Sequence, residues 1–93
     1  MKNGPDFEMY DIVVDNFAKA MKKELLANYD KGDREPPHGW LGMDDKTQLN
    51  ELYYHVGKLQ AALKAKNVEL IKELSADVAN GALMVYDRYA PLK

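Results

Sequence analysis

The segment LNELYYHVGKLQAAL, residues 49–63, carries the clearest structural signal in this 93-residue chain. Its apolar side chains recur at three- and four-residue spacing, which is typical of one face of an α-helix. These side chains are Leu49, Leu52, Tyr53, Val56, Leu59 and Leu63. Asp44 or Asp45 can cap the helix, which we predict to reach about Lys66. An amphipathic helix of this length needs other elements to cover its apolar face.

A third helix is predicted after Asn67, a residue that suits both a turn and a helix cap. This helix would run from about Val68 to Tyr89 and end before Pro91. Its predicted core face comprises Leu70, Ile71, Leu74, Val78, Gly81, Ala82 and Val85. A glycine inside a helix costs about 1 kcal/mol relative to alanine, so we expect a close helix contact or an approaching ligand at Gly81.

A first helix is predicted from Pro5 to about Tyr29, since a proline suits the first helical position. Its apolar stripe comprises Tyr10, Val13, Val14, Phe17, Met21 and Leu25. Residues 30–43 are rich in glycine and proline and should form a loop, with Trp40 and Leu41 as apolar anchors. No segment has the alternation of β-strands. The chain is therefore predicted to be a single all-α domain, residues 1–93, folded as a small helical bundle.

Composition limits the classes of function. A formal net charge of −2 gives no bulk attraction to nucleic acid or to an anionic membrane. The N-terminal residues lack the apolar run of a signal peptide, and no stretch approaches the length of a transmembrane helix. With no cysteine, the chain suits a reducing compartment, and we expect a cytoplasmic protein. We expect no nucleic-acid partner and no membrane partner.

The short length also predicts assembly. A chain of this size buries only about two-thirds of its unfolded surface, so its own core is thin. Two long amphipathic helices and a shorter one cover each other incompletely. We therefore expect the bundle to be completed by homo-oligomerisation, as a dimer or a tetramer.

Two polar stripes flank the predicted core. Glu51, His55 and Lys58 share one side of the second helix. The third helix carries a matching stripe of Glu73, Asp77, Asn80 and Met84. Antiparallel packing would bring the two stripes to face each other across a groove. The alternative left open by the spacing is that both stripes are solvated helix flanks.

The segment ELSADVANGALMVYD, residues 73–87, resembles the second conserved helix of the MazG-like nucleoside triphosphate pyrophosphohydrolases. The order of the other parts is also similar: the first helix ends near Asn28, a Lys-Gly loop (Lys31, Gly32) follows, and Gly39 and Trp40 come before a leucine-rich helix. The resemblance covers roughly residues 17–89, and residues 76–80 are its most specific part. It implies a MazG-like bundle with a nucleotide as the ligand.

The resemblance also implies a four-acid site that holds Mg²⁺ against a triphosphate. Two of the acid positions fall on His55 and Lys58, and a third falls on Leu74. Asp77 matches the fourth, and Asn80 matches a residue that helps to bind the nucleotide. Magnesium prefers carboxylate and phosphate oxygens, so this chain departs from the family at the positions that would bind the metal.

The sequence therefore predicts a catalytically degenerate MazG-like protein that binds a nucleotide, or a nucleotide-derived signal, without hydrolysing it. The residues expected at the nucleotide are His55, Lys58, Asp77, Asn80, Glu51 and Trp40. His55 and Lys58 would bind phosphate directly, without a cofactor. One alternative is an active Mg²⁺-dependent pyrophosphohydrolase whose metal ligands include Asp77 and Glu73. Another is a helical interaction protein with no small ligand.

Overall fold

The computed structural model describes residues 5–30 and 39–90 of the chain. These residues form three α-helices and one short 3-10 helix: α1 (Pro5–Asp30), η1 (Gly39–Gly42), α2 (Asp45–Ala65) and α3 (Val68–Tyr89). The prediction of an all-α domain is confirmed, and the helix boundaries agree to within a residue. Most of the predicted loop 30–43 lies outside the described residues, and its end differs from the prediction because Gly39–Gly42 form η1.

The turn between α2 and α3 is fixed by a cap at each helix end. Lys66 adopts the left-handed conformation, with a φ of 55°, and its backbone N–H donates to the carbonyls of Ala62 and Leu63. Asn67 follows at once, and its side-chain oxygen accepts a hydrogen bond from the Leu70 N–H at 3.2 Å. This confirms Asn67 as the cap of α3 and folds α2 and α3 into a tight antiparallel hairpin.

Polar contacts also fix the other end of the hairpin. Asp44 caps α2 by accepting a hydrogen bond from the Thr47 N–H at 2.7 Å, and this bond holds the pKa of the Asp44 carboxyl below its ordinary value. Arg88, in the last turn of α3, donates to the Asp45 carboxylate at 2.6 Å. The first turn of α2 is thereby tied to the last turn of α3.

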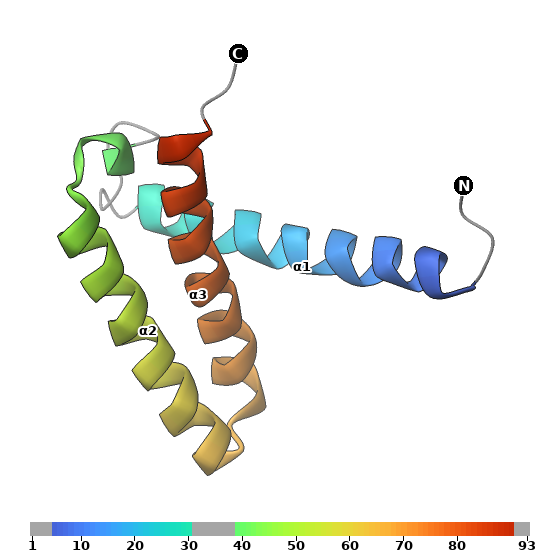
Figure 1. Ribbon diagram of the computed structural model, residues 1–93. Helices are drawn as coiled ribbons and strands as arrows, with labels where there is room; N and C mark the ends of the chain where they lie inside the picture. Colours follow the sequence, from blue (N-terminus) through green and yellow to red (C-terminus); the bar gives the residue numbers. More distant parts are fainter. Residues whose placement is uncertain (1–4, 31–38, 91–93) are drawn as a thin grey trace.

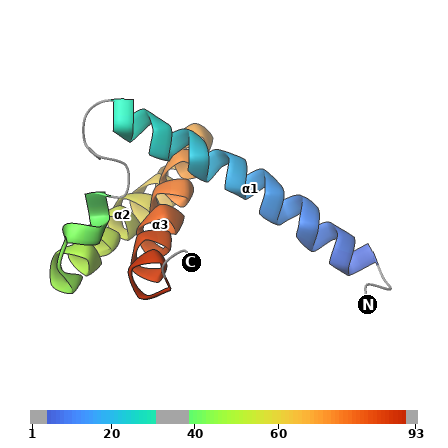
Figure 2. The same cartoon turned by 90° about the horizontal axis from the view of Figure 1, so that it is seen from above.

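Helix α1 crosses the hairpin and then extends away from it. Figures 1 and 2 show its C-terminal half lying against α3, while its N-terminal half projects beyond α2 and α3. At the crossing, the Asn80 side-chain amide donates to the Met21 carbonyl at 3.0 Å. None of the described helices is long and apolar enough to cross a membrane.

The core is small and belongs mainly to α3, which contacts α1, α2 and η1. Its most deeply buried large apolar side chain is Leu74, at 2% exposure. The other buried apolar residues are Trp40, Ala62, Ala76 and Met84, and the buried polar residues are Gln48 and Asn80. So few buried side chains leave a single chain only marginally stabilised by its own core.

The predicted apolar stripes are only partly covered within one chain. On α1, the residues up to Phe17 are exposed, and only Met21 and Leu25 are half-buried. On α2, the exposed members are Leu49, Tyr53, Val56 and Leu63. On α3, Leu70 and Ala82 are exposed, contrary to the predicted core face. This incomplete cover within one chain agrees with the expectation that the three helices would cover each other only in part.

The expected close contact at Gly81 is confirmed. A Cβ built on Gly81 would lie 3.0 Å from Cδ1 of Leu52 and 3.8 Å from the Leu52 Cα. The helices α2 and α3 can approach this closely only because residue 81 has no side chain. Gly57 on α2 presents the opposite case, since a Cβ there would meet nothing within 4 Å.

We predict that these two glycines respond in opposite ways to substitution. Gly81→Leu should lower the free energy of unfolding by about 1–3 kcal/mol, because the new side chain would collide with Leu52. Gly57→Ala should raise it by about 0.5–1 kcal/mol, because alanine favours the helix and has open space. Chemical denaturation followed by circular dichroism, at one protein concentration, measures both. Stability unchanged in Gly81→Leu would contradict the close packing of α2 on α3.

Candidate ligand-binding pocket

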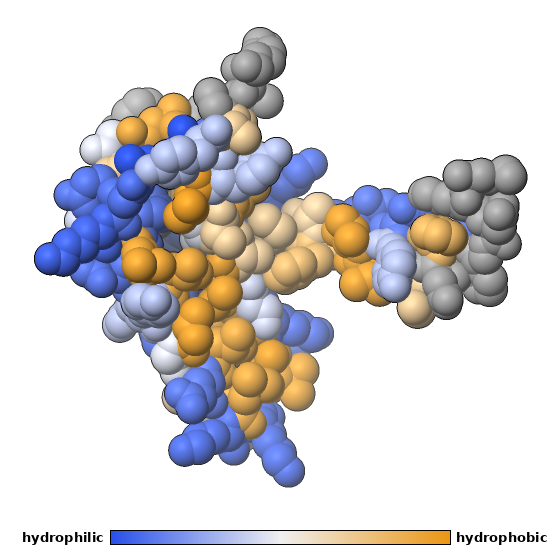
Figure 3. Space-filling view, viewed as in Figure 1, coloured by the Kyte–Doolittle hydropathy of each residue, from blue (hydrophilic) through white to orange (hydrophobic). Residues whose placement is uncertain are grey.

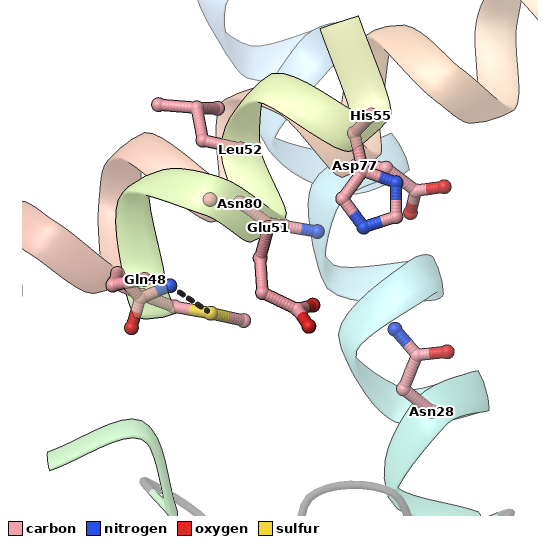
Figure 4. A pocket seen from close by; sticks show the side chains of 9 residues that line it. Asn28, Gln48, Glu51, Leu52, His55, Asp77 and Asn80 are labelled. Carbon is pink, nitrogen blue, oxygen red and sulfur yellow. Dashed lines mark hydrogen bonds between the residues drawn. The ribbon is translucent and has the colours of Figure 1, made fainter. Parts of the chain in front are cut away.

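Side chains from all three α-helices meet at a small polar pocket, here termed the three-helix pocket. Its lining comprises Asn28 of α1, then Gln48, Glu51, Leu52 and His55 of α2, then Asp77, Asn80, Gly81 and Met84 of α3. Figure 4 shows Glu51 and His55 projecting from α2 beside Asp77, with Asn28 on the neighbouring turn of α1. The volume of about 20 Å³ is enough for one water molecule or one small polar group.

Several polar atoms of the pocket residues lack a partner among the described residues. Gln48 is 1% exposed, and its Nε2 lies 3.6 Å from the Met84 sulfur while its Oε1 has no hydrogen bond. Asn80 is 4% exposed, and its Oδ1 is also unpaired although its amide nitrogen bonds the Met21 carbonyl. Nδ1 of His55 is also buried without a hydrogen-bond partner. Each such buried group costs about 1–3 kcal/mol when unpaired, so a water molecule or ligand group that reached these atoms would be stabilised there.

Three carboxylates gather beside the pocket and form what we term the acidic cluster. Glu24 of α1 and Glu73 and Asp77 of α3 each place a carboxylate oxygen within 4.8 Å of the others. Glu73 is exposed, whereas Glu24 and Asp77 are half-buried. Asp77 belongs to both features, because it also lines the three-helix pocket. The cluster therefore adjoins the pocket at Asp77.

The donors present fit a divalent cation. Carboxylate oxygens are the ligands that Mg²⁺ and Ca²⁺ prefer. Ca²⁺ bonds oxygen at about 2.3–2.6 Å, so its opposite ligands lie up to about 5 Å apart, while Mg²⁺ needs them closer, at about 4 Å. Carboxylate oxygens that all lie within 4.8 Å of one another fall inside the span of such a coordination shell.

The structure brings together four of the residues that the sequence predicts at the nucleotide. Glu51 and His55 from α2 meet Asp77 and Asn80 from α3, as expected for antiparallel packing of the two polar stripes. Lys58 does not join them. Its Nζ lies 4.9 Å from the centre of the Tyr54 ring, and its side chain lines a separate apolar groove near the turn between α2 and α3. The structure therefore does not place Lys58 with His55 at this pocket, and its contact with phosphate stays a prediction.

Trp40 also lies away from the pocket. Its ring is buried at 7% exposure, and its indole N–H donates to the Asp87 carboxylate of α3 at 3.1 Å. A ring buried in this way offers no face for stacking on a base, so the structure does not support Trp40 as a nucleotide-binding residue. Its predicted role as an anchor is confirmed, whereas Leu41, at 51% exposure, is no anchor.

The acid position that falls on Leu74 is closed to metal chemistry, since this apolar side chain is buried in the core at 2% exposure. The neighbouring Glu73 lies about 100° around the helix from that position, yet its carboxylate reaches Asp77. Glu73 and Asp77, the metal ligands predicted for an active enzyme, therefore lie close enough to share a cation.

Sequence reasoning missed Glu24, Gln48 and the role of Asn28. Glu24 and Asn28 are four residues apart, so they share a face of α1, but nothing in the sequence shows that this face turns toward α3. Gln48 lies in the first turn of α2, where a polar residue is ordinarily solvated, and here it is buried. The one available signal was the place of Gln48 in the sequence, directly before Leu49 and one helical turn before Leu52 of the apolar stripe.

Comparison of the chain with protein-family models, with curated proteins and with solved structures gives no match in any of the three.

We predict that Trp40 and Leu41 differ in their effect on stability. Trp40→Phe should lower the free energy of unfolding by about 1–2 kcal/mol, because it removes the hydrogen bond to Asp87 and part of the buried ring. Leu41→Ala should change it by less than about 0.5 kcal/mol, since that side chain is largely exposed. Denaturation followed by circular dichroism compares the two. Equal losses would mean that the ring is not the anchor of η1.

Proposed function

We propose that this chain is a MazG-like nucleotide-binding protein that has lost pyrophosphohydrolase activity and holds the phosphates of its ligand through a divalent cation. The observation that carries the proposal is the position of Asp77, which lines the three-helix pocket and belongs to the acidic cluster. A ligand at this point meets hydrogen-bonding atoms on one side and carboxylates on the other. A nucleotide carries groups that suit both sides, with polar groups at one end for hydrogen bonds and phosphates at the other for a cation held by the carboxylates.

The charges around Asp77 favour binding through a cation over direct binding of phosphate. Glu24, Glu73 and Asp77 would repel a bare phosphate, and Lys58 is not among the residues that line the pocket. A bound Mg²⁺ ion would neutralise phosphate charge and bridge it to the carboxylates. In this arrangement Glu24, Glu73 and Asp77 hold the cation. His55 remains beside the ligand as a hydrogen-bonding group.

The size of the three-helix pocket limits what enters it. About 20 Å³ excludes a base or a sugar ring but admits a single amino group, hydroxyl group or water. The unpaired oxygens of Gln48 and Asn80 accept hydrogen bonds and therefore select a donor. The bulk of the nucleotide would then lie at the mouth of the pocket, near Asn28 and Glu51.

The loss of hydrolysis follows from the residues at the acid positions implied by the resemblance. Of those four positions, only Asp77 is acidic, and Leu74 is buried in the core. The second candidate function, an active Mg²⁺-dependent pyrophosphohydrolase, is favoured by one observation: Glu24 and Glu73 supply two further carboxylates beside Asp77.

The proposal also includes a cytoplasmic location, which suits the lack of cysteine.

The binding proposal predicts stabilisation that depends on the cation. A panel of nucleoside mono-, di- and triphosphates, each with and without Mg²⁺, should contain at least one that raises Tm by about 10 °C at 100-fold its Kd, and only with Mg²⁺. Glu73→Gln should weaken that binding at least tenfold in calorimetric titration, because it removes one of the carboxylates.

Glu69→Gln is the matched control for this variant. Glu69 lies on the same helix, one turn before Glu73, and its exposed carboxylate pairs with Lys72 at 3.7 Å. Its substitution should leave the affinity unchanged. Stabilisation by nucleotides without Mg²⁺ would support direct phosphate binding by His55 and Lys58. No stabilisation by any nucleotide would favour an interaction protein without a small ligand.

A separate prediction concerns hydrolysis. Incubation with each common nucleoside triphosphate and Mg²⁺ or Mn²⁺ should release no pyrophosphate above the rate of the Asp77→Asn variant. Release that the parent shows and this variant lacks would establish the active-enzyme alternative. Both proteins should be checked for equal helicity, so that a folding defect is not mistaken for a loss of activity.

We also propose that the chain works as a homo-oligomer. The supporting observation is the large exposed apolar surface of α1 and α2 in a single chain. Monomeric proteins rarely expose apolar surface on this scale without a partner to cover it.

A further inference from the structure

The projecting half of α1 leaves its apolar side chains uncovered within one chain. Residues 7–17, which we term the arm, span about 16 Å of helix and extend beyond the hairpin. The large apolar side chains of the arm are all exposed: Phe7, Met9, Tyr10, Ile12, Val13, Val14 and Phe17. Most of the stability of a helix in a protein comes from packing of its apolar face, and the arm has no such packing within one chain.

A matching apolar surface lies at the far end of the hairpin. We term residues 58–72, around the turn between α2 and α3, the tip. Between the two helices of the tip runs an apolar groove of about 330 Å³. Its floor and sides include the small side chains of Ala61 and Ala65 together with Leu70 and Leu74. Small side chains allow another helix to approach closely.

Figure 3 shows apolar side chains both along the projecting half of α1 and over the hairpin below the crossing. Figure 1 shows that the arm points away from the tip of its own chain, so the two surfaces do not meet within one molecule.

The charges of the two surfaces are complementary. The arm contains Glu8, Asp11 and Asp15 and no basic residue, a net charge of −3. These acids recur at three- and four-residue spacing and so lie on one side of the helix, beside the apolar residues. The tip contains four lysines and one glutamate, a net charge of +3. Opposite charges of this size favour the arm of one molecule on the tip of another.

The size of the exposed surface agrees with a dimer. The chain exposes 7185 Å², whereas a compact monomer of 10.6 kDa exposes about 5,500 Å². Its radius of gyration is 14.9 Å, against about 12 Å for a compact chain of this length. A stable interface of standard size covers about 800 Å² on each partner. The excess surface is therefore sufficient for a reciprocal contact that includes both the arm and the groove.

We infer that two copies of this chain form a dimer in which the arm of each packs into the groove at the tip of the other. This inference specifies the homo-oligomer proposed above. The apolar residues of the arm fill the groove between α2 and α3. Glu8 and Asp15 lie against the lysines of the tip, of which Lys58 lines the groove itself. The contact is isologous, so each molecule contributes one arm and one groove.

Charge reversal tests the inference. Sedimentation velocity at about 20 µM should find the parent as a dimer. An arm variant, Glu8→Lys with Asp15→Lys, and a tip variant, Lys58→Glu with Lys66→Glu, should each sediment as a monomer, with a Kd raised at least tenfold. Mixing the two variants should restore a dimer, because each reversed arm then meets a tip of opposite charge. Combining all four substitutions in one chain should restore the homodimer as well.

The controls separate the arm-to-tip contact from the broader proposal of assembly. Circular dichroism of each variant should show parent-like helicity, and Glu69→Lys should leave the dimer intact, since it adds to the positive charge of the tip. A monomeric parent would overturn the proposed assembly and point to a different protein as the partner of the arm. A parent dimer that both charge-reversal variants retain would overturn only the arm-to-tip contact. Monomeric variants that mixing fails to restore would also overturn that contact.

Discussion

The contact between Leu52 of α2 and Gly81 of α3 determines where the polar side chains of the pocket lie. Residues 51 and 55 flank Leu52 on α2, and residues 77, 80 and 84 flank Gly81 on α3. Because the two helices are in close contact at residues 52 and 81, the side chains on either side of them close around a small space. A larger residue at position 81 would separate the helices and open the pocket. The geometry of the site is in this sense a consequence of one missing side chain.

The helix boundaries and the α2–α3 pairing follow from local rules. Asp44 and Asn67 are strong capping residues, and the turn at Lys66 leaves too little chain for anything except an antiparallel return. The spacing of apolar residues places Glu51 and His55 on the correct side of α2. Local signals therefore predicted both the hairpin and the pairing of its polar stripes.

The contributions of α1 and η1 were not predictable in the same way. The sequence contains no local signal for the angle at which α1 crosses α3, so Glu24 could not be connected with Glu73 and Asp77. Lys58 shares a stripe with Glu51 and His55 on an ideal helix, but its long side chain turns to the Tyr54 ring. The role of Trp40 could not be predicted from sequence either, because a tryptophan in a loop is equally suited to stacking on a ligand and to anchoring the loop.

Asn80 connects the pocket to the orientation of α1. Its amide nitrogen donates to the Met21 carbonyl at the helix crossing, while the buried oxygen of the same planar group has no hydrogen-bond partner among the described residues. Any group that binds this oxygen restricts rotation of the amide and so strengthens the bond that holds α1. Free-energy coupling is reciprocal, so a contact that fixes α1 from outside also orders the amide for a ligand. A ligand that bonded this oxygen would thus couple occupancy of the pocket to the setting of α1 through one side chain.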